Sequence, residues 1–206
     1  MLTNIQQKQI KKIRAMTNII DESKRYEYDI KNLKINSYVS INDEIFIVEE
    51  LSIYKEVKWS SFKEKNNPFI INELKLFSLK NGRTMYVEWS FDDKIEIYQT
   101  VKEVKFKDIK YDGRNINSKD LEEISENEFG YIQYENISYA YDDNETMSAK
   151  YTSDRFKNVK MRMYEFYSTI KDENLTLEVW YDSEKSEKEG YISKEVLSSN
   201  IEVLKI

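Results

Sequence analysis

Carboxylates stand close to aromatic residues at two places in this 206-residue chain. The candidate ligand-binding residues are Glu73, Glu88, Trp89 and Asp92 at the first place and Glu165, Glu178, Trp180 and Asp182 at the second. Two carboxylates about 5–9.5 Å apart between aromatic rings would suit glycoside hydrolysis. The same groups could bind a small cation or ligand, because ring faces add cation–π attraction. The ordinary alternative is a solvated strand surface, on which alternation places outward acids between inward apolar residues.

The two places resemble each other, which predicts an internal repeat. Each has a hairpin that leads into the pattern Glu-x-x-(Phe/Tyr)-Asp, at residues 88–92 and 178–182. If the two halves pack about a pseudo-twofold axis, equivalent carboxylates would face one groove. In a hydrolase, Glu88 and Glu178 would then be the catalytic residues, although the sequence indicates no substrate class.

Missing residue types exclude much common chemistry. The chain has no cysteine and no histidine, which excludes disulfides, Cys/His zinc sites, cysteine nucleophiles and histidine general bases. Its four glycines are too scattered for a P-loop or a Rossmann turn. The run Asp142–Glu145 is rich in oxygen ligands but lacks the EF-hand spacing and glycine. We therefore expect a polar turn there, no metal site and no cofactor.

Charge is distributed unevenly. The net charge is −6, yet residues 1–14 contain four basic residues and no acid, which leaves −10 on the rest. An acidic body repels phosphate, so nucleic acid is not an expected partner. The longest apolar run, Ile45–Val48, is too short for a transmembrane segment or a signal peptide. The sequence thus predicts a soluble, cytoplasmic protein.

Residues 3–20 are predicted to form a helix, capped by Thr3 or Asn4, with Ile5, Ile10 and Ile13 near one face. The ordinary expectation is that it packs on its own domain. The alternatives are contact with a partner or with an anionic membrane surface through its basic residues, which are Lys8, Lys11, Lys12 and Arg14. Two loop aromatics, Trp59 and Phe62, are further candidates for partner binding, although a Trp between strands is more often part of a core.

From residue 37 onward the apolar period is two, which predicts strands. Asn81-Gly82 predicts a type I′ hairpin turn, and two segments around Ile45 and Leu51 fit a strand pair. A short capped helix is expected near Leu121. Expected core residues are Val87, Trp89, Val159, Met161, Leu177 and Val179.

These patterns predict a mainly β fold of two similar antiparallel halves, sandwich- or barrel-like, with the N-terminal α-helix outside the sheets. The expected organisation is an N-terminal helix and linker at 1–32, a first β half at 33–110, a connector at 111–128 and a second β half at 129–206.

Residues 33–206 resemble the bacterial family called domain of unknown function 4178. The resemblance rests on residues 35–54, Trp59, residues 73–76, 86–90 and 95–98, and, near the end of the chain, residues 164–167, 175–180, Glu187, Gly190 and Tyr191. Glu50 stands where that family often has glycine, and Glu88-Trp89-Ser90 departs from its Trp-Leu order. The family has no assigned activity. The resemblance implies a β-rich bacterial protein with an accessory role, because relatives are encoded beside membrane-stress and polyamine-synthesis genes.

Together these observations favour a non-catalytic binding or assembly module in bacterial stress physiology. A tyrosine-rich, glycine-poor β surface is typical of interfaces, so a protein partner or a homo-oligomer is expected. Membrane-surface contact remains an alternative for the basic helix. A carboxylate-based hydrolase and a small cation- or ligand-binding protein are the alternative functions.

Overall fold

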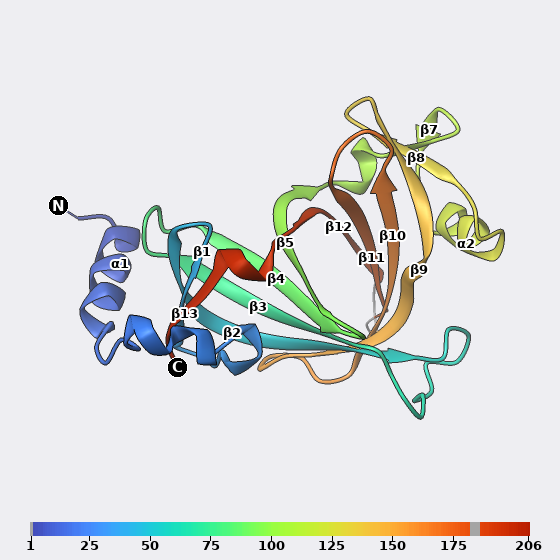
Figure 1. The fold of residues 1–206 in the computed structure, drawn as a ribbon. Coiled ribbons are helices and arrows are strands. Elements are labelled where there is room, and N and C mark those ends of the chain that lie inside the picture. The colour runs from blue at the N-terminus through green and yellow to red at the C-terminus, as the bar shows by residue number, and fades with distance from the viewer. Residues whose placement is uncertain (1, 182–185) are drawn as a thin grey trace. The chain divides into compact units, whose positions relative to one another are not determined.

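A computed structural model describes residues 2–181 and 186–206 of the chain (Figure 1). Within that part, thirteen strands form one antiparallel sheet in the order β13-β1-β2-β3-β4-β5-β12-β11-β10-β9-β8-β6-β7, with a further pairing of β2 and β9. The predicted class, mainly β with an N-terminal helix, is confirmed. No helix of the described residues is both long and apolar enough to cross a membrane.

The element bounds are as follows. The strands are β1 (Tyr38–Ile41), β2 (Glu44–Val57), β3 (Ile70–Ser78), β4 (Thr84–Phe91), β5 (Ile95–Val104), β6 (Lys110–Tyr111), β7 (Arg114–Asn115), β8 (Tyr131–Tyr134), β9 (Ile137–Thr152), β10 (Val159–Ser168), β11 (Asn174–Tyr181), β12 (Ser186–Glu195) and β13 (Ile201–Lys205). The helices are α1 (Asn4–Ala15), α2 (Ser118–Glu126) and four short 3₁₀ segments, η1 (Glu22–Glu27), η2 (Ile30–Asn32), η3 (Phe106–Asp108) and η4 (Ser198–Asn200).

The chain divides into two compact units. Unit 1 comprises residues 1–52, 71–99 and 196–206, and unit 2 comprises residues 53–70 and 100–195. Neither unit is a contiguous half of the chain, because β2 and β5 contribute residues to both and the C-terminal segment returns to unit 1. The internal repeat stays a prediction.

Helix α1 begins as expected but ends early. Thr3 and Gln6 form a capping box at its start, in which each side chain accepts a hydrogen bond from the other residue's backbone amide. The predicted end at residue 20 is wrong, because the chain leaves the helix at Met16 and Asn18 adopts a left-handed backbone, φ 56°. The amide of Ile20 then donates to the carbonyl of Leu204 on β13.

Unit 1 is built around the β3–β4 hairpin. Leu74, Leu76 and Val87 are at most 2% exposed in its core, and Trp89 packs against this cluster while only partly buried. The sequence predicted this hairpin correctly, but the predicted two-residue type I′ turn is wrong. The amide of Ser78 donates to the carbonyl of Arg83, so four residues form the loop, and only Gly82 among them has a positive φ.

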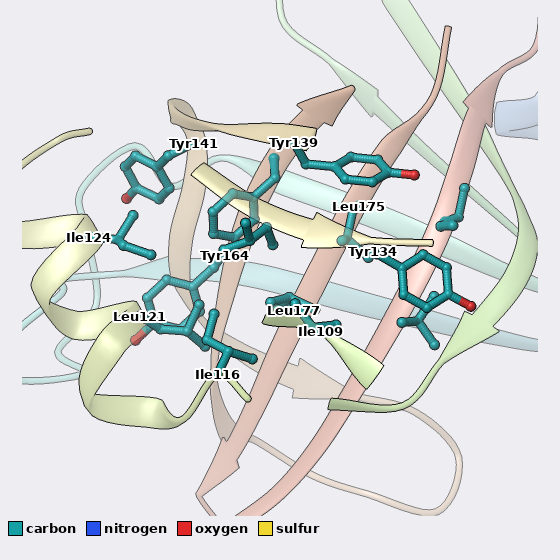
Figure 2. Close-up of a cluster of buried hydrophobic side chains, with 14 of the residues drawn as sticks. Ile109, Ile116, Leu121, Ile124, Tyr134, Tyr139, Tyr141, Tyr164, Leu175 and Leu177 are labelled. Carbon is teal, nitrogen blue, oxygen red and sulfur yellow. The ribbon is translucent and has the colours of Figure 1, made fainter. Parts of the chain in front are cut away.

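Unit 2 has its own core between strands β8–β12 and helix α2, where tyrosine and aliphatic side chains converge (Figure 2). Four of its large side chains, Tyr139, Tyr164, Phe166 and Leu177, are at most 1% exposed. Of the expected core residues in this unit, Met161, Leu177 and Val179 are buried, whereas Val159 is only partly buried.

Helix α2 confirms the short helix that the sequence predicted. The Asn117 side chain accepts from the amides of Lys119 and Asp120, and Asp120 accepts in return from the amide of Asn117. Arg114 donates two hydrogen bonds of 2.6 Å to the buried Asp120 carboxylate. These bonds hold the pKa of Asp120 below its ordinary value. The N-terminus of α2 is therefore fixed to the β7 strand.

Two local predictions about strands are wrong. The two segments around Ile45 and Leu51 are one strand, β2, rather than a pair. The run Asp142–Glu145 is not a turn between strands, because β9 continues through it to Thr152. Asp142 pairs with Glu165 on β10, and Met147 pairs with Met163, so the residues between them form a bulge on β9. The bulge lies beside Glu165.

Candidate functional site

The register of strands β8–β12 places all their basic side chains on one face and five of their acidic side chains on the other. Residues paired across antiparallel strands point to the same face, and so do alternate residues along a strand. The pairs Asp142–Glu165, Glu178–Glu189 and Trp180–Glu187 therefore share one face. We call this the acidic face, defined by Asp142, Glu165, Glu178, Glu187 and Glu189. All basic residues of these strands lie on the opposite face, together with the unit-2 core, and they are Lys150, Lys160, Arg162, Lys188 and Lys194.

The acidic face is buried at its centre and accessible at two edges. Glu178 is 1% exposed between Met161 and Met163, which are buried as well. On β12, Glu187 and Glu189 are exposed, and the Tyr191 hydroxyl donates to Glu189 over 2.6 Å. Accessible carboxylates therefore concentrate at the β12 edge.

Aromatic rings border the other edge. Tyr131 and Tyr167 flank Ala140 in register, each 48% exposed. Phe129 is 67% exposed and packs edge-on against Tyr131, with ring centroids 5.3 Å apart. Exposed rings gathered in this way are unusual on a monomer surface and are a common feature of interfaces.

A second aromatic group continues the acidic face. The Trp180 ring lies edge-on to Tyr151 at 5.0 Å and 6.4 Å from Tyr54. The Nε1 atom of Trp180 is buried with no hydrogen-bond partner among the described residues. Trp180 is thus a packed ring with a free donor on this face.

Glu165 has the most unusual electrostatics of the face. Thr176 Oγ1 donates a hydrogen bond of 3.0 Å to Oε2 of Glu165. The backbone amide of Glu165 donates to Oγ1 of Thr146, which lies on the bulge. Burial, reinforced by the charges of Glu145 and Asp142, raises the pKa of Glu165 from 4.5 to about 8, against the opposing hydrogen bond from Thr176. The carboxyl group is therefore mostly protonated at neutral pH and can donate a proton or a hydrogen bond.

Glu165→Gln is expected to stabilise the protein at pH 8 but not at pH 4. Between the ordinary pKa of 4.5 and the folded value of about 8, the folded state holds more protons than the unfolded state, so stability falls as pH rises. Each unit of pKa shift corresponds to about 1.4 kcal/mol of unfolding free energy. Because Glu165 is partly exposed, we expect Glu165→Gln to raise the unfolding free energy by roughly 1–3 kcal/mol at pH 8.

Urea denaturation at the two pH values measures this difference. The control is Glu187→Gln, the same substitution at an exposed position on the same face. If Glu165→Gln changed the free energy of unfolding equally at pH 4 and pH 8, the raised pKa of Glu165 would be contradicted.

The first set of predicted carboxylates lies in unit 1. Glu73 pairs directly with Glu88 on β3–β4, so they share a face, whereas Trp89 points to the other side. Asp92 is exposed after the end of β4. In unit 2, Glu165 instead pairs with Thr176 and Glu178 with Met163, so these two acids lie diagonally. The two sets are therefore not in the same register. Asp182 lies outside the described residues.

The basic residues predicted for partner binding divide into two kinds. Lys8 lies 2.8 Å from Glu49 and 4.0 Å from the Phe77 ring centre, and Lys12 Nζ lies 3.9 Å from Glu49. Helix α1 therefore packs on its own unit, which is the ordinary expectation. Lys11 and Arg14 remain exposed.

The two loop aromatics predicted for partner binding, Trp59 and Phe62, lie beside Arg162. Its guanidinium carbon lies 4.6 Å from the Trp59 ring centre and 5.7 Å from that of Phe62. Trp59 also packs against the unit-2 core. Sequence reasoning missed Arg162, although basic residues alternate with apolar ones from Lys160 onward and acids alternate from Glu187 onward.

Comparisons with known proteins add no relative. No protein-family model matches the chain, and searches of the curated proteins and of the solved structures found no match. The resemblance to the domain of unknown function 4178 family stays a prediction. Within the part of the chain that the structure describes, no three acidic residues are grouped so that they could hold a metal ion.

Proposed function

We propose that the chain is a non-catalytic binding module that takes a basic segment of a protein partner on the acidic face of β8–β12. The observation that carries this proposal is the separation of charge by the strand register, which leaves no Lys or Arg of these strands on the acidic face. Lysine and arginine heads of a partner would pair with Glu187 and Glu189 on β12, while aromatic side chains farther along the same segment would pack on Tyr131 and Tyr167 at the other edge of the face.

The chemistry of this face favours protein over phosphate-bearing partners. Carboxylates repel both nucleic acid and anionic lipid headgroups, whereas they attract a basic peptide and accelerate its association. A second copy of the chain is one source of such a segment, since Lys11 and Arg14 are exposed on α1. A role in bacterial stress physiology is supported by the family resemblance alone.

A double substitution at the β12 edge is expected to weaken binding of a basic peptide. The probe is a fluorescein-labelled peptide of alternating lysine and phenylalanine, and the readout is fluorescence anisotropy. Removing two exposed ion pairs, at about 0.2–1 kcal/mol each, predicts roughly twofold to thirtyfold weaker binding for Glu187→Gln/Glu189→Gln. Raising the salt concentration should weaken wild-type binding in the same way.

The matched control is Asp92→Asn/Asp93→Asn, which makes the same change of net charge at an exposed site in unit 1. Its affinity should stay close to that of the wild type. Wild-type protein that does not bind the peptide, or equal loss in both double variants, would refute a specific site on the acidic face.

A carboxylate-based hydrolase is the second candidate, favoured by one observation. Glu165 is protonated at neutral pH, and Asp142 pairs with it directly across β9 and β10, so a general acid stands beside a second carboxylate. A screen with glycoside and ester substrates tests this function. Activity that Glu165→Gln abolishes would support it, and activity that survives would exclude Glu165 as the acid. The same screen on Glu88→Gln/Glu178→Gln tests the pair that the sequence indicated.

A further inference from the structure

Arg162 is a mostly buried cation with few partners. Its side chain is 15% exposed, and its Nη1 lies 3.1 Å from Oε1 of Glu122, a residue of α2 whose own side chain is 49% exposed. The Nε atom is buried and has no hydrogen-bond partner among the described residues. A guanidinium has five N–H donors; Glu122, Tyr164 and Tyr181 interact with this one, and its Nε–H is left without a partner in the described part of the chain.

Three aromatic rings hold the guanidinium in place. The rings of Trp59, Phe62 and Tyr181 lie 4.6, 5.7 and 5.6 Å from its central carbon. Phe62 in turn packs edge-on against Tyr181 with ring centroids 5.6 Å apart. Rings on several sides restrict the rotamers of an arginine, so its donors are pre-organised for a planar or tetrahedral oxyanion.

Further donors surround the same point. The hydroxyl groups of Tyr164 and Tyr181 interact with Arg162, and burial raises the pKa of each tyrosine, so both remain protonated. Lys160, the next basic residue on the same face, lies 5.7 Å from the Phe62 ring centre. A guanidinium, two phenols and an ammonium are the groups that bind carboxylate and phosphate oxygens.

We propose that the Arg162 cluster is a binding site for an oxyanion, the carboxylate or phosphate of a small molecule, and that the Glu122 side chain occupies it when no ligand is bound. Glu122 is suited to this role because it is exposed, whereas the neighbouring α2 residues Leu121 and Ile124 are fully buried and hold the helix in place. Its carboxylate can leave by a change of rotamer alone. The site lies on the face opposite to the acidic face, so it does not rest on the proposed function.

The test titrates wild type and Glu122→Gln with inorganic phosphate and, separately, with benzoate at constant ionic strength. The readout is the indole N–H NMR signal of Trp59, assigned with Trp59→Phe. Because Glu122→Gln removes the internal competitor, it should bind the anion about 1.5-fold to fivefold more tightly than wild type. Binding of phosphate, of benzoate or of both identifies the oxyanion, and each of these results supports the site.

Two variants complete the test. Glu123→Gln makes the same charge change on the next, exposed residue of α2 and should bind like wild type. Arg162→Lys, checked for folding by circular dichroism, should lose binding because an ammonium lacks the planar donors. Absence of saturable binding in Glu122→Gln, or equal affinities of Glu122→Gln and Glu123→Gln, would overturn the proposal even if Arg162→Lys does not fold.

Discussion

Phe166→Ala is expected to lower the free energy of unfolding by about 3–5 kcal/mol. Phe166 is 0% exposed in the unit-2 core and packs edge-on against Tyr141, with ring centroids 5.6 Å apart. Removal of the ring leaves a cavity in a cluster whose neighbours are fixed by β-sheet hydrogen bonds, so little of it can collapse. Urea denaturation followed by circular dichroism measures the loss.

The adjacent residue provides the control. Tyr167 is 48% exposed on the acidic face, so Tyr167→Ala should cost less than about 1 kcal/mol of stability. The same change should weaken binding of the basic peptide, which Phe166→Ala cannot test because it destabilises the unit. If Tyr167→Ala cost as much stability as Phe166→Ala, the assignment of these residues to opposite faces would be wrong.

Gly82→Ala is expected to cost about 2 kcal/mol or more and to loosen α1. Gly82 has φ 74°, where a side chain costs about 1–2 kcal/mol. An added Cβ would also lie 2.2 Å from Cγ2 of Ile5, so the Ile5 side chain or the first turn of α1 would have to shift. Because α1 contributes no buried residue, it can detach without unfolding unit 1. Faster hydrogen exchange of α1 amides and faster trypsin cleavage at Lys11 would record this.

Gly113→Ala separates the two effects of Gly82→Ala. Gly113 has φ 78°, close to that of Gly82, yet an added Cβ would meet nothing within 4 Å. It should therefore show the backbone cost alone, with unchanged exchange of α1. Equal exchange of α1 in the two variants would mean that the helix does not rest on the hairpin loop.

Alternation predicted several buried strand residues, because in a strand the period of two separates the two faces. It did not predict that both faces of β10 are covered: Met161 is buried on the acidic face, whereas Tyr164 on the other face belongs to the unit-2 core. Val87, Met161, Leu177 and Val179 are buried as expected. Trp89 faces the unit-1 core but is only partly covered. Large rings are often incompletely buried, and sequence alone does not give the extent.

The bulge and the Arg162 cluster could not be predicted for a different reason. Asp142–Glu145 has the composition of a turn, and only its pairing with β10 carries the strand through it. Trp59 and Arg162 are far apart in the sequence, so their contact needs the tertiary fold. Basic residues alternate along β10 and acidic residues alternate along β12 in the sequence. Only the register of the strands shows that the two sets point to opposite faces.

An NMR titration of the ¹⁵N-labelled protein with the lysine–phenylalanine peptide tests the central claim most directly. A peptide on the acidic face should shift the amide signals of Tyr167, Glu187 and Glu189 in a saturable, salt-sensitive way. Signals of Lys150 and Lys160 on the opposite face should change little. Shifts that centre on Lys150 and Lys160, or no saturable shifts at low salt, would contradict a binding module that uses the acidic face.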